Sequence, residues 1–97
     1  MPTYVLLINW TDQGIRNVKD TIKRAEAFKS AVRRSGGKML DAYYTMGQHD
    51  FVATVELPND ESAMSILLGL GVRGSVRTTT LKAFSLSEVD KVVSKLS

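Results

Sequence analysis

His49 is the only histidine of the chain, and Asp50 follows it, shortly after the turn residue Gly47. A histidine held by a carboxylate acts as a general base near neutral pH, so the pair is a candidate catalytic site. Adjacent residues on a strand point to opposite faces, however, so the two side chains need not touch. Asp50 is equally suited to accept backbone hydrogen bonds that hold a turn shaped by Gly47, which is the structural interpretation.

Pro2 is a second candidate base. Removal of Met1 would expose its secondary amine at the mouth of a strand, and an amine with a depressed pKa accepts a proton near neutral pH. Proline also suits the first residue of a strand, where its missing N–H leaves no ladder partner unsatisfied. Both interpretations stay open from the sequence.

Arg77 stands before three consecutive threonines, of which Thr79 is the middle one. An arginine among hydroxyl groups can bind a carboxylate or a phosphate through its planar guanidinium. In the alternative interpretation the threonines simply favour a strand, and Arg77 pairs with Glu56 or Asp41.

Aromatic residues occur at both ends of the first predicted strand, Tyr4 and Trp10, and at the end of the second, Tyr43 and Tyr44. Aromatic rings stack on planar ligands, and they also fill cores and dimer interfaces. The expected lining of a small-ligand site combines these rings with the polar candidates: Trp10, Tyr43, His49, Arg77 and Thr79.

The composition disfavours several classes of site. With one histidine and no cysteine, and carboxylates without ligand spacing, we expect no metal site. The glycines at 69, 71 and 74 end a predicted helix rather than begin one, so they do not form a phosphate-binding loop, and we expect no cofactor. The absence of cysteine fits a reducing compartment, and we expect a cytoplasmic protein.

The bulk properties indicate one globular domain over residues 1–97, with 43% apolar and 24% charged residues. The net charge of +3 is mild and its basic residues are spread along the chain, so neither nucleic acid nor a membrane surface is an expected partner. No apolar stretch approaches the ~18 residues of a membrane span, and no signal-peptide pattern is present.

Hydropathy patterns predict the elements that position these residues. Residues 3–10 are apolar on both faces, which is typical of a central strand. Apolar residues three and four apart predict a helix over 14–34, ended by Gly36 and Gly37. Asp20 and Thr21 offer a second N-cap, so a short helical turn followed by a longer helix is the alternative.

The second half of the chain continues in the same way. Strands are predicted over 38–45 and 50–57, and the short link makes them an antiparallel hairpin, with Met39, Asp41 and Tyr43 on one face of its first strand. A helix follows Pro58-Asn59-Asp60 and is expected to end at Gly71. A strand over 75–84 and a capping box, Ser85 with Glu88, lead into a last short helix.

The order β-α-β-β-α-β plus a C-terminal helix predicts an α+β, ferredoxin-like antiparallel sheet with both main helices on one face. For the uncovered face we predict one row from each strand: Tyr4, Leu6, Ile8 and Trp10 (or the alternate row of that strand), with Tyr43, Thr54, Glu56, Arg77 and Thr79. A half-apolar face of this kind predicts a C2 homodimer whose sheets pack face to face.

Four segments resemble the GYD domain family, in that family's order: residues 1–4, 10–14, 47–50 and 74–84. The resemblance runs nearly end to end and implies a ferredoxin-like fold of the dimeric α/β barrel type, without implying an activity. One position departs from the family's Gly-x-Tyr-Asp pattern, because His49 replaces its tyrosine. An imidazole has a very different pKa from a phenol, so a role that needs a phenol is not expected here.

Together these features predict a homodimer, or a larger homo-oligomer, that binds a small organic molecule in a cavity at the sheet or dimer interface. The alternative is an enzyme of the oxygenase or isomerase type that works without a cofactor and uses His49 or Pro2 as its base. The fold alone does not decide between them, because such folds host many unrelated functions.

Overall fold

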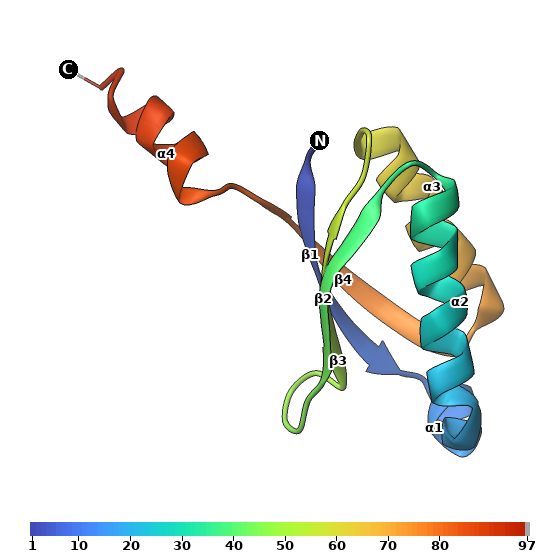
Figure 1. Cartoon of the computed structure of the whole chain (residues 1–97). Coiled ribbons are helices and arrows are strands. Elements are labelled where there is room, and N and C mark those ends of the chain that lie inside the picture. The colour runs from blue at the N-terminus through green and yellow to red at the C-terminus, as the bar shows by residue number, and fades with distance from the viewer. Residues whose placement is uncertain (97) are drawn as a thin grey trace.

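The computed structural model describes residues 1–96. Its elements, in chain order, are β1 (Thr3–Trp10), α1 (Asp12–Arg16), the 3-10 turn η1 (Val18–Asp20), α2 (Thr21–Arg34), β2 (Lys38–Tyr44), β3 (Phe51–Glu56), α3 (Asp60–Arg73), β4 (Val76–Ala83) and α4 (Leu86–Val93). The strands form one sheet in the order β2-β3-β1-β4, and every neighbouring pair is antiparallel. Helices α2 and α3 lie on one face of the sheet, whereas α4 lies on the other side (Figure 1). The predicted ferredoxin-like fold is confirmed, and each strand begins and ends within one residue of its predicted bounds.

The core lies between the sheet and the two covering helices. Its strand residues come from alternate positions of β1 and β3, as expected for strands with one face against helices. Its buried members are Tyr4, Leu6, Ile8, Phe28, Val32, Phe51, Ala53, Val55, Leu57 and Ala63.

The open face of the sheet, which α2 and α3 do not cover, carries the alternate row of β1. Tyr4 lies opposite Val55 across the ladder, and cross-strand partners point to the same face, so the Tyr4 row joins the core. The row first predicted for the open face is therefore wrong. Val5 and Leu7 take that face instead, as the alternative assignment had it.

A β-bulge in β2 changes which of its residues face the core. Met39 lies opposite Val55 and Asp41 opposite Thr54, so Leu40 is the extra residue between them. Met39 consequently packs against the core, whereas Asp41 and Tyr43 belong to the open face. Simple alternation had placed Met39 with Asp41, which is wrong because it allows for no bulge.

The first helical region is split, as the alternative prediction proposed. Thr11 caps α1 by accepting the Gly14 N–H at 3.1 Å, and η1 separates α1 from α2. A 3-10 turn has about three residues per turn, which shifts the phase of the apolar stripe. Ile15 and Ile22 are therefore exposed, contrary to the continuous-helix prediction.

Helix α3 extends past the predicted end at Gly71 and ends at Arg73. The residue after it, Gly74, has φ of 81° and closes the helix in the left-handed conformation that glycine adopts without strain. Among residues 1–96, no helix has the length and apolar character needed to cross a membrane.

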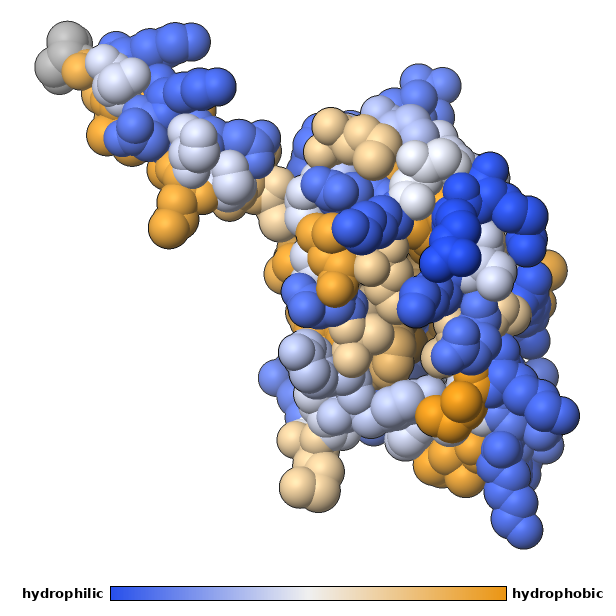
Figure 2. All heavy atoms as spheres, in the orientation of Figure 1, coloured by the Kyte–Doolittle hydropathy of each residue, from blue (hydrophilic) through white to orange (hydrophobic). Residues whose placement is uncertain are grey.

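Helix α4 forms an arm that extends from the end of β4 (Figures 1 and 2). The radius of gyration is 14.8 Å, compared with about 12.5 Å expected for a compact chain of this length. The long dimension of 53 Å reflects the same feature. The arm is therefore the part of the structure that is not packed into the body.

Candidate functional site

A cavity of about 70 Å³ lies between the sheet and helices α2 and α3, near the end of β1. Its apolar wall consists of Ile8, Ala25, Phe28, Phe51, Leu70 and Val76. Its other lining residues are Trp10, Thr21, Arg24, Tyr44, Asp50, Arg73 and Ser75.

An aromatic cluster fixes one side of this cavity. The rings of Trp10 and Tyr44 are stacked with centroids 6.3 Å apart, and Phe51 meets Tyr44 edge to face at 4.8 Å. The Tyr44 hydroxyl lies 3.0 Å from the hydroxyl of Thr21, which ties β2 to the start of α2. A ring held both by stacking and by its polar tip is a preorganised contact surface.

Two arginines border the cavity. Arg24 donates to the carbonyl oxygens of Asn17 at 3.0 Å and Gly14 at 3.4 Å, which anchors its guanidinium at the corner between α1 and α2. Arg73 is the last residue of α3, and its backbone carbonyl accepts from Gln13. Within residues 1–96 the one salt bridge joins Lys82 to Asp60, so neither cavity arginine is paired with a carboxylate.

The charge of the lining therefore favours an anion. Arg24 and Arg73 contribute two positive charges and Asp50 one negative charge, which leaves +1. Guanidinium groups bind carboxylates and phosphates through paired N–H donors. The cavity thus combines an apolar interior with cationic groups at its border.

Asp50 holds the hairpin loop against the end of β1. Its carboxylate accepts the Trp10 N–H at 3.0 Å, its own N–H donates to the Ile8 carbonyl, and its carbonyl accepts the Thr45 N–H. These contacts match the structural interpretation of Asp50. The carboxylate is directed to the backbone of Trp10, and the polar partner of the His49 ring is another residue.

That partner is Asn9. His49 Nδ1 lies 2.9 Å from Asn9 Oδ1, and Asn9 Nδ2 donates to the Gln48 carbonyl at 2.8 Å. The Gln48 carbonyl can only accept, which fixes the orientation of the amide and directs its oxygen to the ring. Nδ1 of His49 is consequently the donor, and in the neutral ring Nε2 carries the lone pair.

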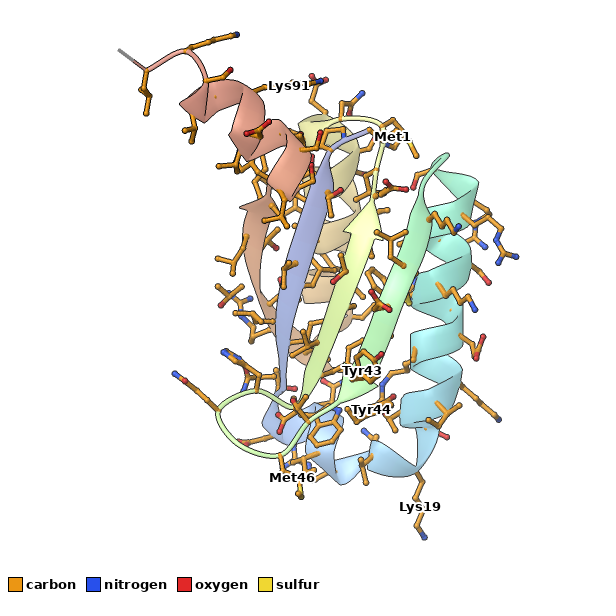
Figure 3. The ribbon with its side chains drawn as sticks, turned by 60° about the vertical axis from the view of Figure 1, so that its left-hand side comes forward. Met1, Lys19, Tyr43, Tyr44, Met46 and Lys91 are labelled. Carbon is orange, nitrogen blue, oxygen red and sulfur yellow. The ribbon has the colours of Figure 1, made fainter. Side chains whose placement is uncertain are left out.

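The expected ligand residues do not all meet. Trp10 continues the core-facing row of β1 and lines the cavity. Tyr43, Arg77 and Thr79 belong to the open face. Leu7 lies on that face, and its cross-strand partners are Val52 and Thr79; Val52 in turn lies opposite Tyr43. Arg77 lies opposite Asn9, which is on the same face of β1 as Leu7. His49 reaches the same face through Asn9. In Figure 3 Tyr43 and the adjacent Tyr44 lie at the hairpin end of β2.

Pro2 lies at the other end of the molecule from the histidine. Its carbonyl accepts the Leu57 N–H at 3.1 Å at the start of β1, whereas His49 contacts Asn9 near the end of that strand. Eight strand residues span about 26 Å, so the two candidate bases cannot share one substrate. Residues 1–96 contain no group of three or more side chains placed to hold a metal ion.

Among the polar lining residues, Thr21, Arg24, Arg73 and Ser75 were not predicted, whereas Tyr44 was one of the rings expected to stack on a planar ligand. The signal for Arg24 was present in the sequence. Thr21, Arg24, Ala25 and Phe28 follow helical spacing along α2, so Arg24 stands within an otherwise apolar stripe. No such signal exists in the sequence for Arg73, because this residue borders the cavity only as a result of the position at which α3 ends.

Comparisons with known proteins agree with this fold. The family model described as GYD domain matches residues 4–93. The chain is 32% identical over 90 residues to the "Glutamine synthetase and cystathionine beta-lyase binding protein" of Thermus thermophilus, a match that covers 92% of this chain and 95% of that protein.

Two solved structures are similar as well. TTHA0845 from Thermus thermophilus superposes with a TM-score of 0.55 at 26% identity, covering 88% of this chain and 95% of that one. MtbAldR gives a TM-score of 0.60 at 18% identity, and the match covers 87% of this chain but only 52% of MtbAldR. At that identity the second similarity shows the fold alone.

Proposed function

This chain belongs to the GYD domain family, and from that premise we propose that it is a homodimeric binding protein for a small organic acid. The observation that carries the proposal is the apolar cavity bordered by Arg24 and Arg73, two cations without a carboxylate partner among the described residues. Under this proposal the ligand binds between the sheet and its helices, rather than between the sheets of two copies as first expected.

The lining selects the chemistry of the ligand. An aliphatic or aromatic group would displace water from the wall formed by Phe28, Leu70 and Val76, which is favourable in proportion to the apolar area buried. A carboxylate would remain at the border, within reach of the guanidinium groups. Trp10 would stack on a planar ligand, the role expected for it from the sequence.

The open face supports the homodimer. Its centre carries Val5, Leu7, Val52 and Leu81 in neighbouring positions of three strands, and none of the helices in residues 1–96 covers them. A contiguous apolar surface of this kind on a sheet is typical of an interface. Two identical sheets that pack face to face around a twofold axis would bury it in both copies.

The ligand proposal is tested with two probes of matched shape. We expect phenylacetate to bind in isothermal titration calorimetry and phenylacetamide, its uncharged counterpart, to bind at least about 10-fold more weakly, because hydrogen bonds to charged groups are the stronger ones. Arg73→Gln should lower the phenylacetate affinity by a similar factor. Arg33→Gln, which removes the same charge from an exposed position of α2 outside the cavity, is the matched control.

Equal affinity for the acid and the amide would refute the assignment of the arginines. Loss of binding in Arg33→Gln to the same degree as in Arg73→Gln would show that only overall charge matters. Absence of heat for phenylacetate and for the aliphatic acid 4-methylpentanoate would remove the cavity as a site for small acids.

A second candidate function is docking on a partner enzyme, and two observations favour it. The Thermus relative is named as a binding protein for two enzymes. In this chain the outer side of α3 exposes Met64, Leu68 and Val72, four residues apart, and thus presents an apolar stripe to solvent. An apolar stripe of this spacing is suited to pack against another protein.

This candidate is tested on the glutamine synthetase of the protein's own host. Leu68→Glu should abolish binding measured by biolayer interferometry, whereas Ser30→Glu, which adds the same charge at an exposed position of α2, should not. Binding that is absent in the unmodified chain, or that survives Leu68→Glu, would rule out this surface.

A further inference from the structure

Helix α4 carries an apolar stripe that the rest of the chain leaves in solvent. Leu86 is 92% exposed, Val92 61% and Leu96, just beyond the helix, 72%. Val89 and Val93 complete the stripe at helical spacing, and in Figure 2 the hydrophobic atoms gather along one side of the arm with hydrophilic atoms along the other.

The helix is well specified by its sequence although nothing covers it. Ser85 accepts the Glu88 N–H at 3.1 Å and the Glu88 carboxylate accepts the Ser85 N–H at 2.9 Å, which forms a complete capping box. The pKa of Glu88 is lowered by these hydrogen bonds to Ser85. A helix of eight residues is nevertheless marginal in water without tertiary packing. Its stripe therefore requires a partner surface.

The direction of the arm limits where that surface can be. Phe84 and Ser85 are the only residues between β4 and α4, and Ser85 has an extended backbone, with φ of −69° and ψ of 163°. Helix α4 continues outward from the strand instead of folding back over it (Figure 1). Figure 1 shows it on the open-face side of the sheet, opposite α2 and α3.

We propose that α4 packs its apolar stripe on the part of a second copy's open sheet face that the facing sheet leaves uncovered, so that two copies exchange arms. This inference rests on the homodimer of the proposed function, and it does not depend on the ligand. A second copy fits because a sheet that faces this one presents its own uncovered residues on the side to which α4 extends. Phe84, 61% exposed at the base of the arm, extends the apolar contact toward that sheet.

The arrangement leaves the polar side of α4 in water. Glu88, Lys91 and Lys95 lie off the stripe. Burial of one valine side chain contributes enough free energy to change an association constant by about 10-fold or more. Symmetry doubles the effect, since each dimer contains two arms.

Photo-crosslinking tests where the arm binds. The chain has no cysteine, so Val89→Cys can be labelled at one position with benzophenone maleimide. Equal amounts of ¹⁴N- and ¹⁵N-labelled protein are mixed and illuminated, and the crosslinked peptides are read by mass spectrometry. We expect mixed-isotope crosslinks from position 89 to β1, β3 or β4. Lys91→Cys, on the polar side, should give few.

Same-isotope crosslinks alone would show that the arm returns to its own chain and would overturn the inference. Crosslinks to α3 of the second copy, or none while the dimer mass persists, would overturn it as well. A chain that is monomeric in analytical ultracentrifugation would remove the homodimer together with the arm exchange, but it would leave the cavity and its binding of phenylacetate unaffected.

A second measurement compares dimer dissociation constants. Val89→Lys should weaken the dimer at least about 10-fold relative to Ser87→Lys, which adds the same charge off the stripe. Both variants should bind phenylacetate as the unmodified chain does, because the cavity lies on the other side of the sheet. Equal dissociation constants for the two variants would refute the exchange.

Discussion

Tyr4 is 4% exposed, and its hydroxyl donates to the carboxylate of Asp60, which Lys82 also approaches at 3.1 Å. Burial raises the pKa of Tyr4 to about 12, and both the hydrogen bond to Asp60 and the charge of that carboxylate act in the same direction. The hydrogen bond from Tyr4, followed by the contact with Lys82, lowers the pKa of Asp60. The three side chains thus couple the start of β1 to α3 and β4.

The raised pKa of Tyr4 predicts a loss of stability in alkali. Because the folded pKa exceeds the unfolded value of 10.0, stability is fully present below pH 10 and is lost as the pH rises toward about 12. In urea titrations at several pH values, Tyr4→Phe should reduce this loss. Tyr43→Phe, at an exposed tyrosine, should leave the dependence of the unfolding free energy on pH as it is in the unmodified chain. If Tyr4→Phe leaves the pH dependence of the unfolding free energy unchanged, the loss of stability in alkali does not come from Tyr4.

Single residues also show where sequence reasoning stops. The structural interpretation of Asp50 could be made from its place beside a turn, since aspartate commonly accepts backbone N–H groups there. The contact of His49 with Asn9 could not, because it joins residues 40 positions apart through the β1–β3 register. The sequence shows residue types, but the alignment of two strands decides which side chains meet.

At the scale of elements, Gly14 sets how closely α1 approaches the start of β4. A Cβ atom there would lie 1.9 Å from the Ser75 carbonyl oxygen. Gly14→Ala should therefore force a backbone shift and destabilise the fold by about 1–3 kcal/mol. A Cβ atom at Gly69 in α3 would have no atom within 4 Å. Gly69→Ala should therefore stabilise the fold by about 0.5–1 kcal/mol, because alanine favours the helix.

Thermal unfolding of the two variants measures this contrast directly. Melting temperatures should move in opposite directions, down for Gly14→Ala and up for Gly69→Ala. A Gly14→Ala chain that melts with the unmodified protein would mean that α1 can move away from β4 at little cost.

The elements differ in how well their sequences predicted them. The bounds of β1 followed from its apolar run and those of β3 from its alternation, which the structure shows as alternating buried and half-buried positions. The bulge at Leu40 and the 3-10 turn at Val18–Asp20 did not, because each inserts a local change of phase that depends on packing against neighbours. Residues were assigned to the wrong face of an element only near these two positions and in the first strand, where both rows are apolar.

At the scale of the whole molecule, we expect the stability of helix α4 to depend on the protein concentration. The backbone amides of α4 should exchange rapidly with deuterium when the protein is dilute and monomeric, since a short uncovered helix frays. They should become protected when the protein is concentrated enough to dimerise. Hydrogen exchange at two protein concentrations, with the amides of β1 as the protected reference, measures this. Equal protection of α4 at both concentrations would contradict it.

Strand β4 begins in the cavity wall at Val76 and ends at Ala83, where the arm departs. The proposed ligand site and the base of the arm therefore lie at the two ends of one strand. Thermodynamic linkage makes any coupling along it reciprocal: an acid that tightens assembly must bind the assembled form more tightly than it binds the single chain. A protein built in this way would respond to the concentration of a small metabolite by a change in its own oligomeric state.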